Sequence, residues 1–336
     1  MSASVVEGAV QEMSYGEASR AALLEAMTED PRVWALGEDI GIEGGTAGQY
    51  LGLVDIFGPD RIVNTPISEA TIAGAGAGAA ATGTRPVVEL RYGDLMLCAA
   101  DEIINQAAKL RYMFNGQSRV PMVIRAASGI MGGFSVHHSQ SLEAIWAHIP
   151  GLVVVAPTTP QDAYGLLKAA IRADDPVVYL EHKVLLRTTG PVVTGQETPI
   201  GTASVLREGA DVTIVTWSAM CLRALEAAGQ LEQQGIDAEV IDLRSLWPWD
   251  REAVMASVAK TGRLLVVHEA VRVGGFGAEV AAEIGELLWG RLRAPVRRLG
   301  APRTPVPFSE PLEDAVSIFP PRIAEAARSL VTGSAS

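Results

Sequence analysis

Four polar features of the sequence could take part in chemistry. Three are the carboxyl residues Glu38, Glu69 and Asp94, and the fourth is the run 137–140 (His-His-Ser-Gln). Each follows a segment that resembles a strand, and open parallel sheets bind ligands beyond the carboxyl ends of their strands. Carboxyl and imidazole groups can donate and accept protons, so each feature is a candidate for general acid–base chemistry.

Each feature also has an ordinary structural explanation. Glu38 could hydrate a loop, and Ser68 could cap the helix that follows it, with Glu69 favoured at the positive helix end. Histidines such as His137 and His138 are common in exposed loops. Residue type and spacing alone leave both explanations open.

Several cofactor motifs are absent from the sequence. It has no GxxxxGK[ST] loop, no GxGxxG opening a helix and no CxxC. A Gly-Asp-Gly motif with a following Asn pair, which would mark a magnesium-bound diphosphate, is missing too; the nearest match is Gly93-Asp94-Leu95. We therefore expect that this chain does not hold a diphosphate alone.

The elements that would position these residues alternate between strand and helix. In the first half the predicted strands are 33–36, 61–64, 86–90, 120–126, 152–156 and 177–180, and the predicted helices are 15–27, 68–82, 95–113 and 160–172. Short, continuously apolar strands separated by helices indicate a parallel sheet covered on both faces. The first domain should span 12–186.

The alternation of predicted strands and helices stops in the Thr-, Gly- and Pro-rich stretch 187–200, which we interpret as a linker. A smaller α/β domain should follow at 201–332. Its predicted strands are 212–217, 238–243, 264–269 and 296–299, and its predicted helices are 220–234, 250–259, 277–289 and 321–330.

Composition narrows the class of protein. The 336 residues include 39 acidic and 27 basic side chains, a formal net charge of -12, so nucleic acid and anionic membranes are poor partners. The most apolar segment, 70–84, is too short to span a bilayer, and no secretory signal is visible. Cys98 and Cys221 show no metal-ligand spacing and are expected to be buried thiols of a cytoplasmic protein.

Six stretches in order carry a resemblance to a known family. From about Ser14 to about Pro311, the sequence resembles the β subunits of pyruvate, branched-chain 2-oxo acid and acetoin dehydrogenases. The stretches are Gly-Glu-Asp 37–39, Asn-Thr-Pro-Ile-Ser-Glu 64–69, His-Ser-Gln-Ser 138–141, Pro-Gly-Leu-Val-Val-Val-Ala-Pro 150–157, Asp-Ala-Tyr-Gly-Leu-Leu 162–167 and Glu-Val-Ile-Asp-Leu-Arg 239–244.

The resemblance implies a transketolase-like fold, with a pyrimidine-binding domain followed by a transketolase C-terminal-like domain. The first domain would bind the aminopyrimidine of thiamine diphosphate. A separate α subunit would hold the diphosphate and Mg²⁺, in an assembly of two α and two β chains. The complex would decarboxylate a 2-oxo acid and pass the acyl group to a lipoyl-bearing dihydrolipoyl acyltransferase.

The resemblance also implies roles for individual residues. Glu69 matches the glutamate that shares a proton with ring nitrogen N1′ of the aminopyrimidine and so favours the reactive imino tautomer. His138, preferred over His137, would face the substrate and assist carbanion handling or acyl transfer. Glu38 would line an acidic path between paired active sites or serve structure.

Two positions depart from the family pattern. Leu95 stands where an aromatic residue usually stacks on the aminopyrimidine, and Tyr92, three residues earlier, could compensate. Asn64 replaces the usual Asp before Thr-Pro. Some relatives also bind a structural K⁺ through backbone carbonyls; the matching carbonyls here belong to Met122, Ala170, Ile171, Ala173 and Asp175.

Two alternatives to a 2-oxo acid dehydrogenase stay open. An acetoin-cleaving enzyme would share this half-site and differ mainly in residues from the α chain. A catalytically silent partner would use the same fold for assembly only, although such a scaffold would need neither Glu69 nor His138.

Overall fold

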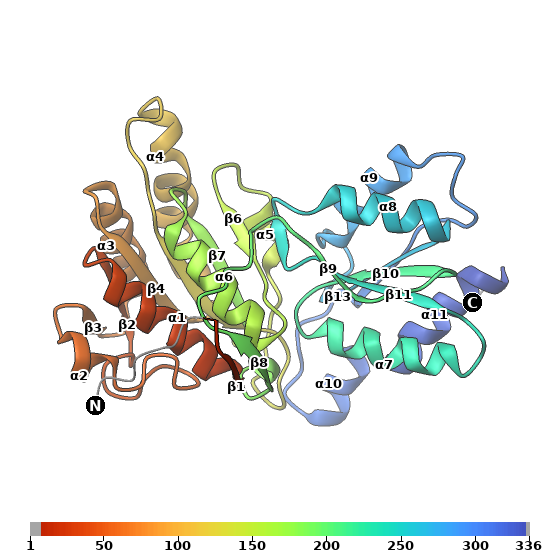
Figure 1. The fold of residues 1–336 in the computed structure, drawn as a ribbon, viewed down its shortest axis with the longest axis horizontal. Helices are drawn as coiled ribbons and strands as arrows, with labels where there is room; N and C mark the ends of the chain where they lie inside the picture. Colours follow the sequence, from red (N-terminus) through yellow and green to blue (C-terminus); the bar gives the residue numbers. More distant parts are fainter. Residues whose placement is uncertain (1–7, 334–336) are drawn as a thin grey trace. The chain divides into compact units, whose positions relative to one another are not determined.

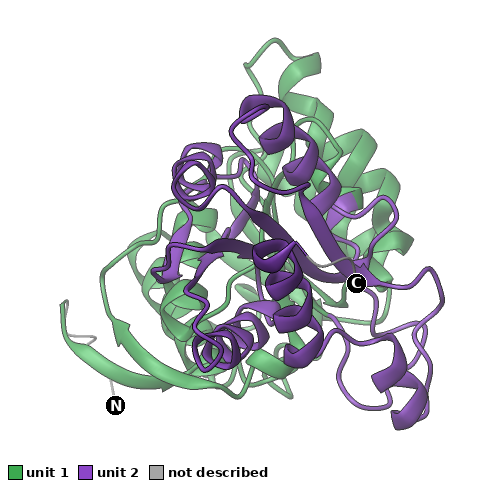
Figure 2. Cartoon of the chain, turned by 90° about the vertical axis from the view of Figure 1, so that its right-hand side faces the viewer, with its two compact units in different colours: residues 1–128, 145–200 green, residues 129–144, 201–336 purple. Residues whose placement is uncertain are grey.

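The computed structural model describes residues 8–333, which fold as two compact units (Figures 1 and 2). Of the described residues, the first unit comprises 8–128 and 145–200, and the second comprises 129–144 and 201–333. The short segment 129–144, which carries both candidate histidines, therefore belongs with the second unit. The domain range expected from the sequence, 12–186, had placed this segment in the first domain.

A parallel sheet forms the centre of the first unit. Its strands run in the order β6-β7-β5-β4-β2-β3, and each neighbouring pair is parallel. The strand bounds are β2 Val33–Glu38, β3 Ile62–Thr65, β4 Arg85–Tyr92, β5 Val123–Ser128, β6 Val153–Val155 and β7 Val177–His182. Strands β5 and β7 are buried along their whole length, as expected for a sheet covered on both faces.

Helices connect these strands. Their bounds are α1 Tyr15–Glu29, α2 Leu53–Phe57, α3 Glu69–Ala81, α4 Ala108–Met113, α5 Glu143–Ala147 and α6 Pro160–Arg172. Helices α1 and α6 pack against each other, and α3 packs against β4. Capping boxes at Ser14 and Thr159 define where α1 and α6 begin.

The long helix expected at 95–113 is divided into three types of helical turn. A 3-10 segment, η1 Leu95–Ala99, is followed by a π-helical segment, η2 Asp101–Ala107, and then by α4. The apolar spacing indicated a helix but does not distinguish the three helix types. Their backbone hydrogen bonds differ by only one residue in span. A further 3-10 turn, η3 Lys183–Leu185, follows β7.

The expected linker 187–200 contains a strand. Strand β8 Thr189–Val193 pairs antiparallel with β1 Val10–Ser14, in the register Val10↔Val193. This ribbon joins the two ends of the first unit. The sequence pattern did not predict this strand because Gly190 and Pro191 are poor strand formers, and because its pairing partner lies far away in the sequence.

The second unit has its own sheet, in the order β14-β13-β10-β11-β9, parallel except for β9. The strands are β9 Ser204–Arg207, β10 Val212–Thr216, β11 Ala238–Asp242, β13 Leu264–Val271 and β14 Arg297–Ala301, with a short strand β12 Ser245–Trp247. The helices are α7 Met220–Glu232, α8 Arg251–Thr261, α9 Gly277–Leu287, α10 Glu310–Val316 and α11 Pro320–Thr332. Helices α7 and α11 pack together over a core that includes Ile214, Val240 and Ile323.

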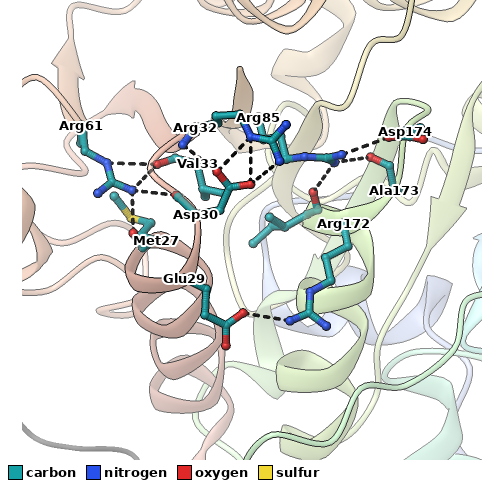
Figure 3. A network of polar contacts seen from close by, with 11 residues as sticks. Met27, Glu29, Asp30, Arg32, Val33, Arg61, Arg85, Arg172, Ala173 and Asp174 are labelled. Atoms are coloured by element: carbon teal, nitrogen blue, oxygen red, sulfur yellow. Dashed lines mark hydrogen bonds and ion pairs between the residues drawn. The ribbon is translucent and has the colours of Figure 1, made fainter. Parts of the chain in front are cut away.

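Two arginines cap helix ends in the first unit (Figure 3). Arg61 Nη2 donates to the carbonyl oxygens of Met27 at 2.7 Å and Val33 at 2.6 Å, just around the end of α1. Arg85 Nη1 donates to the carbonyl oxygens of Ile171 at 3.0 Å and Ala173 at 2.9 Å, at the end of α6. The Met27, Ile171 and Ala173 carbonyls lie at helix C-termini, where no partner within the helix is available, whereas Val33 is the first residue of β2.

Candidate functional site

The expected site residues of the first unit lie at one edge of its sheet. In the register of β2 and β3, Glu38 is opposite Thr65, and Glu69 begins α3 four residues later. On the other side of β2, strand β4 leads into η1, which begins at Leu95. All three strands are parallel, so their carboxyl ends share this edge, and α3 packs against η1 and η2.

The Glu69 side chain is half-buried. Within residues 8–333 its carboxylate makes no hydrogen bond and no ion pair, so its oxygens are available to a ligand. Ser68 occupies the N-cap position of α3 but provides no side-chain cap, because its hydroxyl donates to the Pro66 carbonyl at 3.1 Å. The expected Ser68 cap was therefore wrong.

Tight packing fixes α3 beneath Glu69. A Cβ at Gly76 would lie 2.5 Å from Val88 Cγ2 on β4, and a Cβ at Gly74 would lie 3.3 Å from Glu102 Cγ in η2. These glycines let α3 approach the sheet and its neighbour within the unit. Gly78, in contrast, has no neighbour within 4 Å of such a Cβ.

Glu38 shares the electrostatic environment of Glu69. Burial raises the pKa of Glu38, the charges of Asp39, Glu69 and Glu43 raise it further, and Arg91 opposes them. Glu38 therefore holds a proton more readily than an ordinary glutamate. The Glu69 carboxylate is close enough to contribute, so the two residues form one acidic site.

Arg91 is a basic residue of this edge that sequence inspection did not single out. The register of β4 with β5 shifts between Glu89 and Tyr92, and Arg91 has a φ of 53°. The kink directs its guanidinium to Asp39, at 2.6 Å, and to Glu43, at 3.6 Å. This β-bulge brings Arg91 to the site, and no sequence pattern predicted the bulge.

Leu95 is half-buried where η1 begins. Tyr92, which we considered as a substitute aromatic, has the ammonium group of Lys183 5.7 Å from its ring centroid. Lys183 is buried at the end of β7 and was also not anticipated. Asn64, the other departure, accepts a hydrogen bond from the Gly41 amide at 3.0 Å and so ties the segment after Glu38 to β3.

A buried charge cluster lies within the sheet of the first unit. Arg125 Nη2 is 2.7 Å from Glu181 Oε2, and Arg125 Nε is 3.9 Å from Glu89 Oε2. The Tyr50 hydroxyl donates to Glu89 at 3.0 Å. Burial raises the pKa of Glu89 to about 7, and Glu181 adds to the rise while Arg125 opposes it. One guanidinium thus faces two carboxyls, and Glu89 titrates near neutrality.

The candidate histidines belong to the second unit. His137 is exposed, while His138 is half-buried and its amide donates to the Ser135 carbonyl at 3.4 Å. Ser139, the next residue, is buried. This hydrogen bond and these degrees of burial do not test a catalytic role for His137 or His138, so the preference for His138 stays a prediction.

The five carbonyls expected to bind K⁺ have protein partners in several cases. Ile171 and Ala173 accept from Arg85, as described above, while Met122 accepts from the Val177 amide at 2.9 Å and Ala170 from the Ala173 amide at 3.2 Å. A carbonyl oxygen has two lone pairs, so the ion stays a prediction. Arg85 supplies a positive charge at the same oxygens.

Both cysteines are free, but the expectation of two buried thiols was wrong for one of them. Cys221 is buried in α7, whereas Cys98 is exposed in η1. Within residues 8–333, every helix is too short or insufficiently apolar to cross a membrane.

Comparison with protein families accounts for nearly the whole chain. Residues 11–189 match the transketolase pyrimidine-binding domain, and residues 201–323 match the transketolase C-terminal domain. The chain is 43% identical over 323 residues to the 2-oxoisovalerate dehydrogenase subunit beta of Bacillus subtilis, an alignment that covers 95% of this chain and 98% of the relative. The chain belongs to the β subunits of the thiamine-diphosphate-dependent 2-oxo acid dehydrogenase family.

Other members of the family are equally similar. The chain is 44% identical to the acetoin:2,6-dichlorophenolindophenol oxidoreductase subunit beta of Cupriavidus necator, over 96% of this chain and 98% of the relative. It is also 44% identical to the pyruvate dehydrogenase E1 component subunit beta-1 of Arabidopsis thaliana, over 90% and 85%. Identities this close do not separate the substrates of the family.

Solved structures show the same fold. The chain of a split-gene transketolase, described as an inactive beta4 tetramer, aligns with a TM-score of 0.78 and 26% identity over 95% of this chain and 98% of that one. A transketolase from Pichia stipitis aligns with a TM-score of 0.71 and 16% identity over 98% of this chain and 47% of that one, which shows the fold alone. The predicted two-domain transketolase-like α/β fold is confirmed.

Proposed function

We propose that this chain supplies the pyrimidine-binding half of a thiamine-diphosphate site in a 2-oxo acid dehydrogenase. An α subunit supplies the diphosphate pocket and Mg²⁺, in an assembly of two α and two β chains. The complex decarboxylates a 2-oxo acid and transfers the acyl group to a lipoyl-bearing acyltransferase. The observation that carries the proposal is the Glu69 carboxylate, without a hydrogen-bonding partner among residues 8–333 at the ligand-binding edge of a pyrimidine-binding domain.

The residues of this edge fit the cofactor's pyrimidine. Bound thiamine diphosphate supplies an acidic thiazolium carbon and an electron sink. Glu69 holds a proton at N1′ of the ring, and Leu95 provides an apolar wall. The Glu38 carboxyl, with its raised pKa, can carry the proton that leaves Glu69.

His138 serves the later acyl transfer in this proposal. When the acyl group passes to the lipoyl group, a new carbon–sulfur bond would replace its bond to the cofactor, and the sulfur–sulfur bond of the lipoyl disulfide would break. The acyl carbon is oxidised while the disulfide is reduced, and the second sulfur leaves as a thiolate. His138 can donate a proton to that thiolate, since an imidazole can serve as a general acid.

Replacement of Glu69 by glutamine tests the cofactor role. In a complex with an α-type chain that contains Gly-Asp-Gly, Glu69→Gln should lower kcat for cofactor-dependent decarboxylation by at least about 100-fold, because an amide keeps the shape but cannot share the proton. Glu12→Gln, an exposed carboxyl on β1 of the same unit, is the control and should leave turnover unchanged. Normal turnover in an assembled Glu69→Gln complex would refute the assignment.

An acetoin-cleaving enzyme is the second candidate, supported by the Cupriavidus necator relative. The same half-site would serve it, because the cofactor attacks a carbonyl carbon in either reaction. Assays of the assembled complex with pyruvate, branched-chain 2-oxo acids and acetoin discriminate the two: the substrate with the highest kcat/KM identifies the enzyme.

A further inference from the structure

The loop that carries His137 and His138 is attached to the second unit. We call residues 129–144 the histidine loop; in the sequence it lies between β5 and β6, yet it groups with the second unit (Figure 2, purple). The Gly129 amide donates to the Gln140 carbonyl at 3.3 Å, which brings the two ends of the loop together. Four residues of the loop have positive φ: Gly129, Gly132, Gly133 and Ser135. Such a chain path needs external contacts to hold it.

One carboxylate of the second unit binds both ends of the histidine loop. Glu269 lies on β13 and is buried. Its Oε2 accepts a hydrogen bond from the Ile130 amide at 3.0 Å and another from the Ser141 hydroxyl at 2.8 Å. A single ionised oxygen thus joins positions that are eleven residues apart, and charge-assisted bonds of this kind are stronger than neutral ones.

Two more contacts hold the loop from other elements of the same unit. The Gly133 amide donates to Glu313 Oε2, on α10, at 2.9 Å. The Trp217 indole donates to Glu143 Oε1, at the end of the loop, at 3.1 Å. Glu313, Trp217 and Glu143 are all buried, so these bonds form away from competing water.

Trp217 is itself fixed by His268. The two rings stack at 5.5 Å between centroids with an interplanar angle of 14°. His268 is enclosed by Gly275, Gly277 and Gly300, where a Cβ would come within 2.7 Å of its ring. Burial lowers the pKa of His268 to about 4, so it stays neutral and serves as a packing element rather than an acid or base near neutrality.

We propose that Glu269 is a positioning residue for His138, and that Glu313 and Trp217 complete a clamp on the histidine loop. The inference rests on the proposed function, because it assigns to the second unit the task of orienting the imidazole that serves acyl transfer. Glu69 and Glu38 belong to the first unit, whereas Glu269, Glu313 and Trp217 belong to the second. Loss of the clamp therefore affects one chemical step and spares the other.

Glu269→Gln in the assembled complex tests the proposal. The amide can accept at its single oxygen, but without the charge that joins Ile130 and Ser141. We expect acyl transfer to the lipoyl group to slow about 10- to 100-fold, since displacement of a catalytic group by about 1 Å can cost 100-fold. Decarboxylation followed with a dye oxidant should change less than about threefold. An equal loss in both assays, or no loss in either, overturns the proposal.

Two further variants keep the test valid if Glu269→Gln disturbs folding. Ser141→Ala removes one bond of the clamp and should slow acyl transfer in the same direction, and the double variant should be no slower than Glu269→Gln alone. Glu239→Gln is the matched control: Glu239 is a buried carboxyl of the same sheet that accepts from the Gly209 amide and Lys260. Glu239→Gln should leave the ratio of acyl transfer to decarboxylation unchanged. A changed ratio would show that any disturbance of the second unit slows acyl transfer.

Amide exchange separates failure of the clamp from failure of the proposed function. In the purified full chain, the Ile130 and Gly133 amides should exchange at least about tenfold faster in Glu269→Gln than in Glu239→Gln. Unchanged exchange overturns the clamp, whatever the enzyme does. Normal acyl transfer by His138→Ala would instead refute the proposed role of that histidine while leaving the exchange result intact.

Discussion

At the residue scale, the first unit uses glutamates in two different ways. Glu38 ends β2 and Glu69 begins α3, and their carboxyl oxygens form no hydrogen bond with another described residue. Glu89 and Glu181 lie inside the sheet and share the guanidinium of Arg125. The first arrangement leaves acceptors for a ligand, whereas the second satisfies buried charge with a single cation.

The pKa of Glu89 makes stability depend on pH. Its folded value, about 7, is above the ordinary value of 4.5, so the folded chain holds a proton that the unfolded chain releases. The resulting stabilisation is complete below the unfolded value and is lost as pH rises through 7. Glu89→Gln keeps an acceptor for Tyr50 and removes the titration. Relative to the native protein, it should therefore gain about 2.5 kcal/mol in unfolding free energy between pH 5 and pH 8.

Urea unfolding of both proteins at pH 5 and pH 8 measures this difference. Glu17→Gln serves as the control, because hydrogen bonds from Ser14 lower the pKa of Glu17, and its titration falls below this range. A Glu89→Gln difference that is the same at both pH values would show that Glu89 remains ionised in the folded protein.

The sequence predicted the candidate site residues, which follow the ends of strands. It did not predict the ion pair that joins two neighbouring strands. Glu69 and His138 belong to stretches that resemble a known family, so the sequence alone identified them as candidate site residues. Arg125 and Glu181 are 56 residues apart and meet only because β5 and β7 are neighbours in register. An alternating or apolar pattern predicts a strand but not its neighbour.

At the element scale, helix ends are satisfied by side chains from distant strands. Arg61 serves the end of α1 and Arg85 the end of α6, and each reaches its carbonyls from the beginning of a strand region. Local patterns locate a helix, whereas the donors at its C-terminus come from the tertiary fold. The same limit applies to β8, whose partner β1 lies at the opposite end of the unit's sequence.

The shared carbonyls of α6 allow a test of the K⁺ prediction. Arg85→Gln removes the guanidinium from Ile171 and Ala173 and leaves their oxygens to a soluble cation. We expect the melting temperature to depend on K⁺ over Na⁺ more strongly in this variant than in the native chain, by roughly 2–4 °C for each kcal/mol of added ion binding.

Thermal unfolding in equal concentrations of KCl and NaCl gives the comparison. Arg61→Gln is the control, since it removes an equivalent cap from α1 and leaves the α6 carbonyls untouched. If the native chain and Arg85→Gln each melt at the same temperature in KCl as in NaCl, the predicted K⁺ site does not exist.

At the scale of the whole molecule, the chain has surfaces that favour protein partners over nucleic acid. Its formal net charge is -12, while large apolar side chains are exposed on both units, among them Tyr112 at 89% and Trp289 at 87%. Exposed aromatic residues are enriched in protein interfaces. The sequence has no Gly-Asp-Gly motif, and in the proposed function the α subunit supplies the diphosphate pocket.

Purified alone, the chain should therefore show no thiamine-diphosphate-dependent turnover of any 2-oxo acid or of acetoin, however much cofactor and Mg²⁺ are added. Glu69 can meet a pyrimidine ring, but a ring without its diphosphate anchor lacks most of its binding energy and is not held for attack on a substrate. Titration with an α-type chain should restore turnover up to one α per β and no further. A chain that turns over substrate without a partner would place a diphosphate site within these 336 residues and end the half-site model.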